Sequence, residues 1–228
     1  MLALLVAGCS SGAPPPGAAT TSGSLDRLDA AVRAVSADRR EVLAAAAAVQ
    51  AAAAALDAAD EVCATGRGVA ARAAHDRAVP LVRAAGTAFA RLAAVVPSYQ
   101  ASLTSVGAAS VAVQGAARQA LLRVVTVGTD EADALERFRV VAVRAWPQYA
   151  ALDAAEDTWI VRAVTPWYRT DQEAAAAYVV LVEDRRSALV AARTSLGDAA
   201  AALRAPISAQ SSTLAAADQA LASVRGKR

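Results

Sequence analysis

A long heptad repeat near the start of the chain constrains the fold more than any other feature of the sequence. Apolar residues recur every seven positions, at Leu28, Val35, Val42, Val49, Leu56 and Cys63. A repeat of period 3.5 places these residues on one face of a helix, where they pack against a neighbouring helix. The pattern predicts one helix that begins after an N-cap at Ser24 and ends before the break at Gly66 to Gly68. At 1.5 Å per residue, this helix is roughly 55–60 Å long.

Apolar residues at three- and four-residue spacing continue along the rest of the chain, interrupted by proline and glycine. They predict helices over 69–96 with a kink at Pro80, 98–127 closed by Gly128, 130–165 with a kink near Pro147, 170–203, and a short last helix that presents Leu214, Leu221 and Val224. Two-residue alternation is missing from the sequence, so we expect no sheet. The sequence therefore predicts an all-α fold over 25–225, an elongated antiparallel bundle of about five long helices plus a short C-terminal helix.

The composition agrees with a helical chain and narrows the choice of partners. Hydrophobic residues make up 56% of the 228 residues and aromatic residues 4%, with alanine supplying much of the first figure. Alanine favours helix because it loses no side-chain entropy there, and it lets helices approach closely. The formal net charge is +2 and the charges are mixed along the chain. We therefore expect no nucleic-acid partner, since no basic stripe is present.

The segment Leu5-Val6-Ala7-Gly8-Cys9 resembles the lipobox of bacterial lipoproteins. In that family the cysteine sulfur is acylated and the preceding residues are removed. The resemblance implies a signal peptide over 1–8, lipidation of Cys9, and a cell-membrane protein held by lipid at the extracytoplasmic face. The apolar run is short and no Lys or Arg precedes Cys9, so we expect the charged n-region of the signal to lie upstream. Residues 9–24, rich in Ser, Pro, Gly and Thr, then form a flexible tether.

Few residues are candidates for metal binding or catalysis. His75, the single histidine, extends the inward face of the second predicted helix, but no second histidine and no paired cysteine motif accompany it. Cys63 continues the first heptad and is expected to be a buried, inert thiol. Phosphate-binding glycine loops, GxSxG elbows and HExxH pairs do not occur in the sequence. We therefore expect no metal, no cofactor and no enzyme.

Four charged residues occupy positions where the helical seam would be apolar: Arg39, Asp60, Glu156 and Arg185. A lone buried charge is costly, so these side chains are expected to be paired or to lie at the ends of the bundle. One interpretation is that they fix the register of the helices. The other, which includes His75, is a polar pocket inside the bundle.

The three tryptophans lie between Trp146 and Trp167. Trp146, Tyr149 and Trp159 share a helix face and are expected in the core. Trp167, Tyr168 and Arg169 lie before a capping box at Thr170, in which Glu173 is placed to reach back to the Thr170 amide. This loop is the candidate contact with a partner, because aromatic and arginine side chains dominate interface hot spots. The alternative is that Trp167 folds back and plugs the end of the bundle.

Two functions are compatible with these features. The first is a membrane-anchored extracytoplasmic lipoprotein, whose bundle is a non-enzymatic scaffold or protein-interaction module with a protein partner in the envelope. The second is a small-ligand or lipid-binding lipoprotein with a pocket between helices near Trp159 and Trp167. A closed alanine seam would favour the scaffold, and an apolar cavity would favour the ligand-binding protein.

Overall fold

The computed structural model describes residues 18–165 and 167–226, and all regular structure within them is helical. The long helices are α1 (Ala18–Cys63), α2 (Gly68–Ala109), α3 (Gly115–Val164), α4 (Asp171–Ala202) and α5 (Arg204–Arg225), and a short 3-10 helix, η1 (Ser110–Ala112), follows α2. The prediction of an all-α fold is confirmed.

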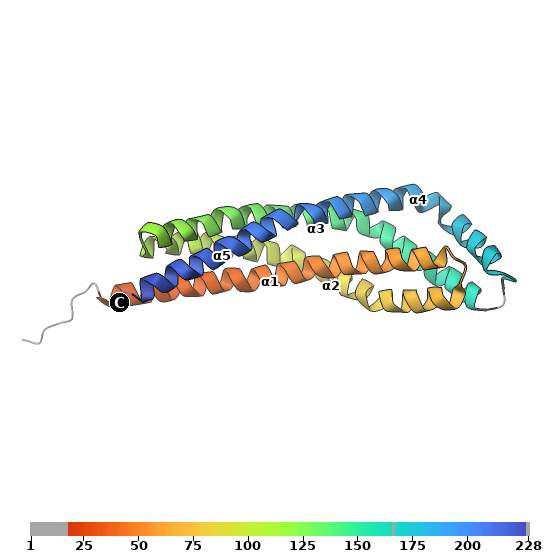
Figure 1. The fold of residues 1–228 in the computed structure, drawn as a ribbon, viewed down its shortest axis with the longest axis horizontal. Coiled ribbons are helices and arrows are strands. Elements are labelled where there is room, and N and C mark those ends of the chain that lie inside the picture. The colour runs from red at the N-terminus through yellow and green to blue at the C-terminus, as the bar shows by residue number, and fades with distance from the viewer. Residues whose placement is uncertain (1–17, 166, 227–228) are drawn as a thin grey trace, which may run out of the picture.

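The helices lie along one long axis; α1, α2, α3 and α4 alternate in direction, and α5 continues in the direction of α4 (Figure 1). The start of α1 and the end of α5 lie at one end of the molecule, where Arg225 forms an ion pair with Asp29. The α1–α2 turn and the α3–α4 loop lie at the other end. Leu203, which joins α4 to α5, has helical backbone angles, so these two helices run on from each other. With α4 and α5 counted as one continuous segment, the described chain forms four long helical rods, so the prediction of about five long helices plus a short one is wrong.

The predicted heptad of α1 forms the centre of the core. All six of its residues, from Leu28 to Cys63, have no exposed surface, and α1 packs against α2 along most of its length. Burying each Val or Leu side chain contributes about 1.5–3 kcal/mol. The start of α1 differs from the prediction: the helix begins at Ala18, so Ser24 lies inside it and is not the N-cap.

Two predicted helix boundaries are wrong. We expected a break at Pro97 and a helix end at Gly128, but α2 and α3 pass through these residues without interruption. Pro97 lies on the exposed face of α2, as does Ala93, whose carbonyl loses its hydrogen-bond donor and can bind water instead. Pro80 and Pro147 are exposed as well. A proline on the outer face costs one hydrogen bond but does not disturb the buried face.

The break between α2 and α3 falls instead after η1. Val113 and Gln114 adopt extended backbone angles, and Gly115 has a φ of +58°, which glycine adopts at little cost. The segment formed by α4 and α5 bends at Leu203 but does not stop at Pro206. This proline lies in the first turn of α5, where its missing N–H group would have no helical acceptor.

Segments Gly23–Cys63 and Gly68–Ala112 are also long and apolar enough to cross a membrane, by length and composition alone. Their apolar character comes largely from alanine. Core helices of soluble bundles meet the same criterion, and these two helices form the most extensive helix pair in the structure.

Candidate functional site

Two regions of the described chain gather polar and aromatic side chains. The first is the end formed by residues 66–73, 163–165 and 167–174, which we call the distal end because it lies opposite the start of α1. The second is the interior of the bundle, where charged side chains form two layers. The predicted lipidation site Cys9, with the rest of the lipobox, lies outside the described residues.

An open pocket of about 570 Å³ lies at the distal end, between the first turns of α2 and α4. Its polar lining comes from Arg67, Arg169, Thr170 and Asp171, and alanine supplies half of the other lining residues. Gly66 allows the α1–α2 turn to reach α4: it has a φ of +77°, and a Cβ atom there would overlap the backbone carbonyl of Asp171. The pocket therefore has a wall of tightly packed backbone.

Of the predicted partner-contact residues, Tyr168 and Arg169 line this pocket and Trp167 precedes them in the same loop, and the three differ in exposure. Trp167 is 73% exposed, so the alternative in which it plugs the bundle end is wrong. Tyr168 is partly buried against the core and lines the pocket, and Arg169 is exposed at its edge. The capping box is present in a shifted form. Thr170 Oγ1 accepts the Glu173 N–H at 3.1 Å, and the Glu173 carboxylate accepts the N–H of Arg169, not of Thr170, at 3.0 Å.

Other aromatic side chains belong to the core. Trp159 and Tyr149 are buried, as predicted, whereas Trp146 is partly buried and stacks on Tyr149. The indole N–H of Trp159 donates to the carbonyl of Ala174 at 2.9 Å and so holds α3 against α4. Apolar side chains are also exposed in the first turn of α2, at Val69, and near the end of α3, at Val161 and Val164. The distal end thus combines exposed apolar surface with arginines.

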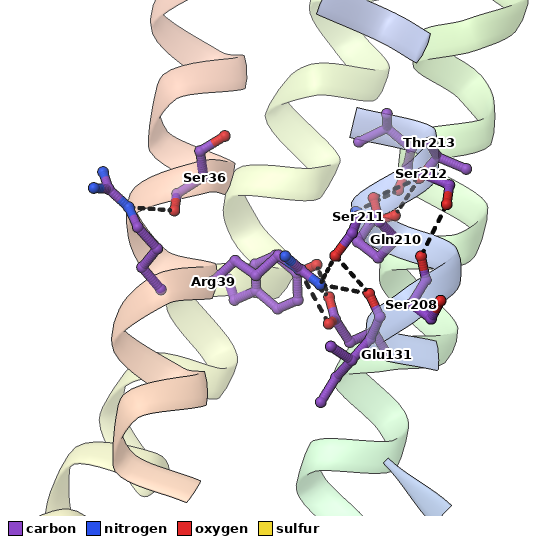
Figure 2. A network of polar contacts seen from close by, with 12 residues as sticks. Ser36, Arg39, Glu131, Ser208, Gln210, Ser211, Ser212 and Thr213 are labelled. Atoms are coloured by element: carbon purple, nitrogen blue, oxygen red, sulfur yellow. Dashed lines mark hydrogen bonds and ion pairs between the residues drawn. The ribbon is translucent and has the colours of Figure 1, made fainter. Parts of the chain in front are cut away.

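The first interior layer, the Arg39 layer, joins four helices (Figure 2). Arg39 of α1 donates to the carboxylate of Glu131 on α3 at 2.8 Å, and to the carbonyl of Ile207 on α5 at 2.7 Å. Tyr99 of α2 donates its hydroxyl to the same carboxylate at 2.6 Å. Glu131 has no exposed surface, and the charge-assisted hydrogen bonds from Arg39 and Tyr99 compensate its burial. The pKa of Tyr99 is raised, first by burial and second by its hydrogen bond to Glu131.

Gln210 of α5 extends the Arg39 layer and explains the glycine at 128. Its amide nitrogen donates to the carbonyl of Val124 on α3 at 3.1 Å, and its oxygen accepts the Thr213 hydroxyl at 2.7 Å. A Cβ atom at Gly128 would lie 2.7 Å from that amide nitrogen and would overlap Leu103. Gly128 is therefore a contact point between helices and not a helix end.

The second interior layer, the Arg193 layer, joins α1 to α4 nearer the distal end. Arg193 donates to Asp57 at 2.5 Å and to Asp60 at 2.8 Å, and the Tyr178 hydroxyl donates to Asp60 at 2.6 Å. The hydroxyl of Tyr149 on α3 approaches Asp57 at 3.5 Å. Burial raises the pKa of Asp57 although Arg193 opposes the shift. A pocket of about 280 Å³ opens at the surface beside Asp57, Tyr149 and Arg193.

Glu156 lies next to this layer and is different from every other charged residue in the described core. It has no exposed surface, and neither carboxylate oxygen has a hydrogen-bond partner. Burial, and then the charge of Asp60, raises its pKa to about 9. Cys63 is buried and free, and burial, followed by the charge of Glu156, raises the pKa of its thiol. Both observations agree with the expectation of an unreactive Cys63.

The two remaining candidate residues are His75 and Arg185, and neither belongs to a polar layer. His75 is nearly buried and its Nε2 lies 3.0 Å from Asp153 Oδ1; this bond raises the pKa of His75. Among the described residues no group of three or more His, Cys, Asp or Glu side chains could hold a metal ion. Arg185 is exposed on α4 and bonds the carbonyl of Ala151, so its predicted place in the seam is wrong.

Sequence reasoning did not identify Glu131, Gln210, Asp57 or Arg193 as members of polar layers. Glu131 precedes the seam residues Leu135 and Phe138 by four and seven positions, a signal that would have found it. Chemically, both layers are suited to holding distant helices together, because their carboxylates are bonded to arginine or tyrosine. In comparisons with known proteins, no family model, curated protein or solved structure matches this chain.

Proposed function

We propose that this chain is a non-enzymatic lipoprotein that spaces a protein-docking end away from the membrane. In this proposal Cys9 carries the lipid, residues 1–8 are removed, and the bundle stands at the extracytoplasmic face of the cell membrane. A protein of the envelope binds at Trp167, Tyr168 and Arg169.

The observation that carries the proposal is that the exposed Trp167 belongs to the α3–α4 loop, and this loop lies at the end of the molecule opposite the start of α1 (Figure 1). Helix α1 has 46 residues, which corresponds to about 69 Å at 1.5 Å per residue. A tether attached to α1 would therefore place Trp167 far from the lipid. Large exposed aromatic side chains beside arginine supply contact area at low entropic cost.

The two polar layers support a spacer because they make the bundle stiff along its length. The Arg39 layer joins α1, α2, α3 and α5, and the Arg193 layer joins α1 to α4. Breaking either layer leaves a buried or half-buried charge without its partner, which is costly. An alanine-rich seam alone would hold the helices together less strongly, since each alanine buries little apolar area.

A site-specific crosslinking experiment tests the docking end. The photoreactive residue p-benzoylphenylalanine replaces Trp167 in the full-length chain, in its own cell envelope. Val180, which is 76% exposed on the side of α4, carries the same residue as a matched control. We expect a discrete crosslinked protein from position 167 and none from position 180. Equal crosslinking at both positions, or none at 167, would contradict a docking end.

Cys9→Ser tests the anchor separately. We expect the wild-type chain in the membrane fraction with an acyl group on Cys9, and the Cys9→Ser chain, expressed from the same start, in the soluble fraction. A Cys9→Ser chain that stays with the membrane would contradict lipid anchoring and leave the crosslinking result unaffected.

The second candidate function, a small-ligand-binding lipoprotein, is favoured by the pocket of about 570 Å³ at the distal end. Arg67, Arg169 and Thr170 in its lining fit a polar ligand better than a lipid tail. Native mass spectrometry of protein purified from its own membranes tests this function. A bound mass that is present in the wild type and lost in Ala70→Trp, which fills the pocket, supports it; equal spectra of the two proteins contradict it.

A further inference from the structure

Glu156 is a buried acid without a partner, and this is unusual enough to require an explanation. Its side chain lies on α3 with no exposed surface, and both oxygens lack a hydrogen bond within the described structure. Buried carboxylates are normally paired, because an isolated ionised group in a protein interior is very costly. A carboxyl group in this position is stable only when it carries a proton.

The titratable groups around Glu156 come from all of the neighbouring helices. Helix α1 contributes Asp57, Asp60 and Cys63, and α4 contributes Tyr178 and Arg193. On α3 itself Asp153 lies one turn before Glu156 and is bonded to His75 of α2. The two basic groups in this set are already engaged, since Arg193 bonds Asp57 and Asp60 and His75 bonds Asp153. Glu156 thus faces carboxylates and has no cation of its own.

The connection between α4 and α1 depends on this same layer. These two helices are close at only a few positions, and the bonds of Arg193 and Tyr178 to Asp57 and Asp60 are what joins them. On the other side, Trp159 holds α4 to α3 through the carbonyl of Ala174. A negative charge on Glu156 would appear between α1, α3 and α4, beside carboxylates that already use the available arginine.

We propose that Glu156 is a proton-binding site that controls the closure of α4 over α1 and α3. While the carboxyl group holds its proton, the layer is closed. When α4 parts from α1, water reaches Glu156 and the proton leaves to solvent. This device regulates the bundle and is independent of the docking function proposed above.

The proposal has a quantitative consequence. In the open state the carboxyl group is hydrated and titrates near the ordinary value for glutamate, about 4.3. In the closed state its pKa is about 9. Opening at any pH between these values releases about one proton, so the opening equilibrium rises about tenfold for each pH unit.

Cys63 is a built-in reporter of this opening. It lies in the same layer, has no exposed surface, and is one of two cysteines in the chain. The full-length chain with Cys9→Ser therefore has a single thiol. Iodoacetamide reacts with the thiolate, so labelling of a freely exposed cysteine itself rises about tenfold per pH unit below a thiol pKa of about 8.5.

The experiment compares the pH dependence of Cys63 labelling between pH 6 and 8. For the parent chain we expect labelling to rise about 100-fold per pH unit, tenfold from the thiolate and tenfold from the proton released by Glu156. Glu156→Gln keeps the shape of the side chain but has no carboxyl proton to release. For this variant we expect labelling to rise about tenfold per pH unit. Glu183→Gln, the same change at an exposed position of α4, should behave as the parent does.

Two outcomes would overturn the proposal. One is a tenfold rise per pH unit in the parent chain itself, which decides the question even if Glu156→Gln does not fold. The other is a labelling rate that increases in low urea as steeply as global unfolding does, because a local opening exposes little surface. A steep pH dependence that is insensitive to low urea and is lost only in Glu156→Gln supports the proposal.

Discussion

Gly128→Ala is expected to destabilise the protein although alanine is the better helix former. Gly128 is buried in the middle of α3, where a Cβ atom would lie 2.7 Å from Gln210 Nε2 and overlap Leu103. Leu103 is itself buried in the core and has no free space to move into. Overpacking of this kind costs about 1–3 kcal/mol, and displacing Gln210 from the carbonyl of Val124 costs about 1 kcal/mol more.

The gain in helix propensity works in the opposite direction and is smaller. Replacing glycine by alanine inside a helix is worth about 1 kcal/mol. The net loss is therefore about 1–3 kcal/mol. For a chain of 228 residues this lowers Tm by roughly 2–12 °C, at about 2–4 °C per kcal/mol.

Gly197→Ala is the matched control for this substitution. Gly197 lies inside α4, and a Cβ atom there would have no atom within 4 Å. Only the propensity gain of about 1 kcal/mol remains, so Tm should rise by roughly 2–4 °C. Thermal melts followed by circular dichroism measure both variants. A Tm for Gly128→Ala that equals or exceeds that of Gly197→Ala would refute the close approach of α5 to α3.

Three further predictions test the layers and the distal end. Arg39→Ala should cost about 3–5 kcal/mol in chemical denaturation, because it leaves the buried Glu131 without its cation; a loss below 1 kcal/mol would contradict the Arg39 layer. Trp167→Ala should change the free energy of unfolding by less than about 0.5 kcal/mol, whereas Trp159→Ala should lower it by about 3–5 kcal/mol. Equal losses in the two variants would contradict the different exposure of the two side chains. The raised pKa of Glu156 stabilises the fold fully below pH 4.5, and this contribution is lost as the pH rises through about 9. From pH 6 to 8 the stability of the wild type should therefore fall by about 2–3 kcal/mol more than that of Glu156→Gln, and parallel pH profiles in urea titrations would sink this assignment.

The part of the fold that could be predicted is the part that depends on local periodicity. The heptad from Leu28 to Cys63 identified α1 and its buried face because each residue there repeats the same environment one heptad later. The Thr170 cap was found for a similar reason, since it involves residues three or four positions apart. Neither inference needed knowledge of a distant helix.

Helix boundaries were less predictable because proline and glycine were judged without their tertiary surroundings. Pro97 is tolerated inside α2 because it lies on the exposed face. Gly128 is required in α3 because Gln210, far along the chain, occupies the space of a side chain. The local signal is the same in a helix that ends and in a helix that another helix approaches closely. Only the position of α5 distinguishes the two cases.

The charged residues at seam positions show a second limit of prediction from local periodicity. Their periodicity identified Arg39, Asp60 and Glu156 as inward-facing, but their surroundings are formed by residues elsewhere in the chain. Arg185 had the same periodic signal and is exposed, because every residue of α4 from 183 to 188 faces solvent. Periodicity shows which face of a helix a residue occupies, but not whether another helix covers that face.

The two polar layers also solve a problem that the alanine-rich seam creates. Consecutive heptads of α1 present similar small side chains, such as Ala46 and Ala53, so sliding α1 by seven residues changes the apolar contacts little. The same slip would carry Arg39 away from Glu131 and leave the carboxylate buried without a cation. It would separate Asp57 from Arg193 at the same time. Because an unpaired buried charge costs several kcal/mol, far more than a change among alanines, the layers select one register among several that the apolar seam alone would accept.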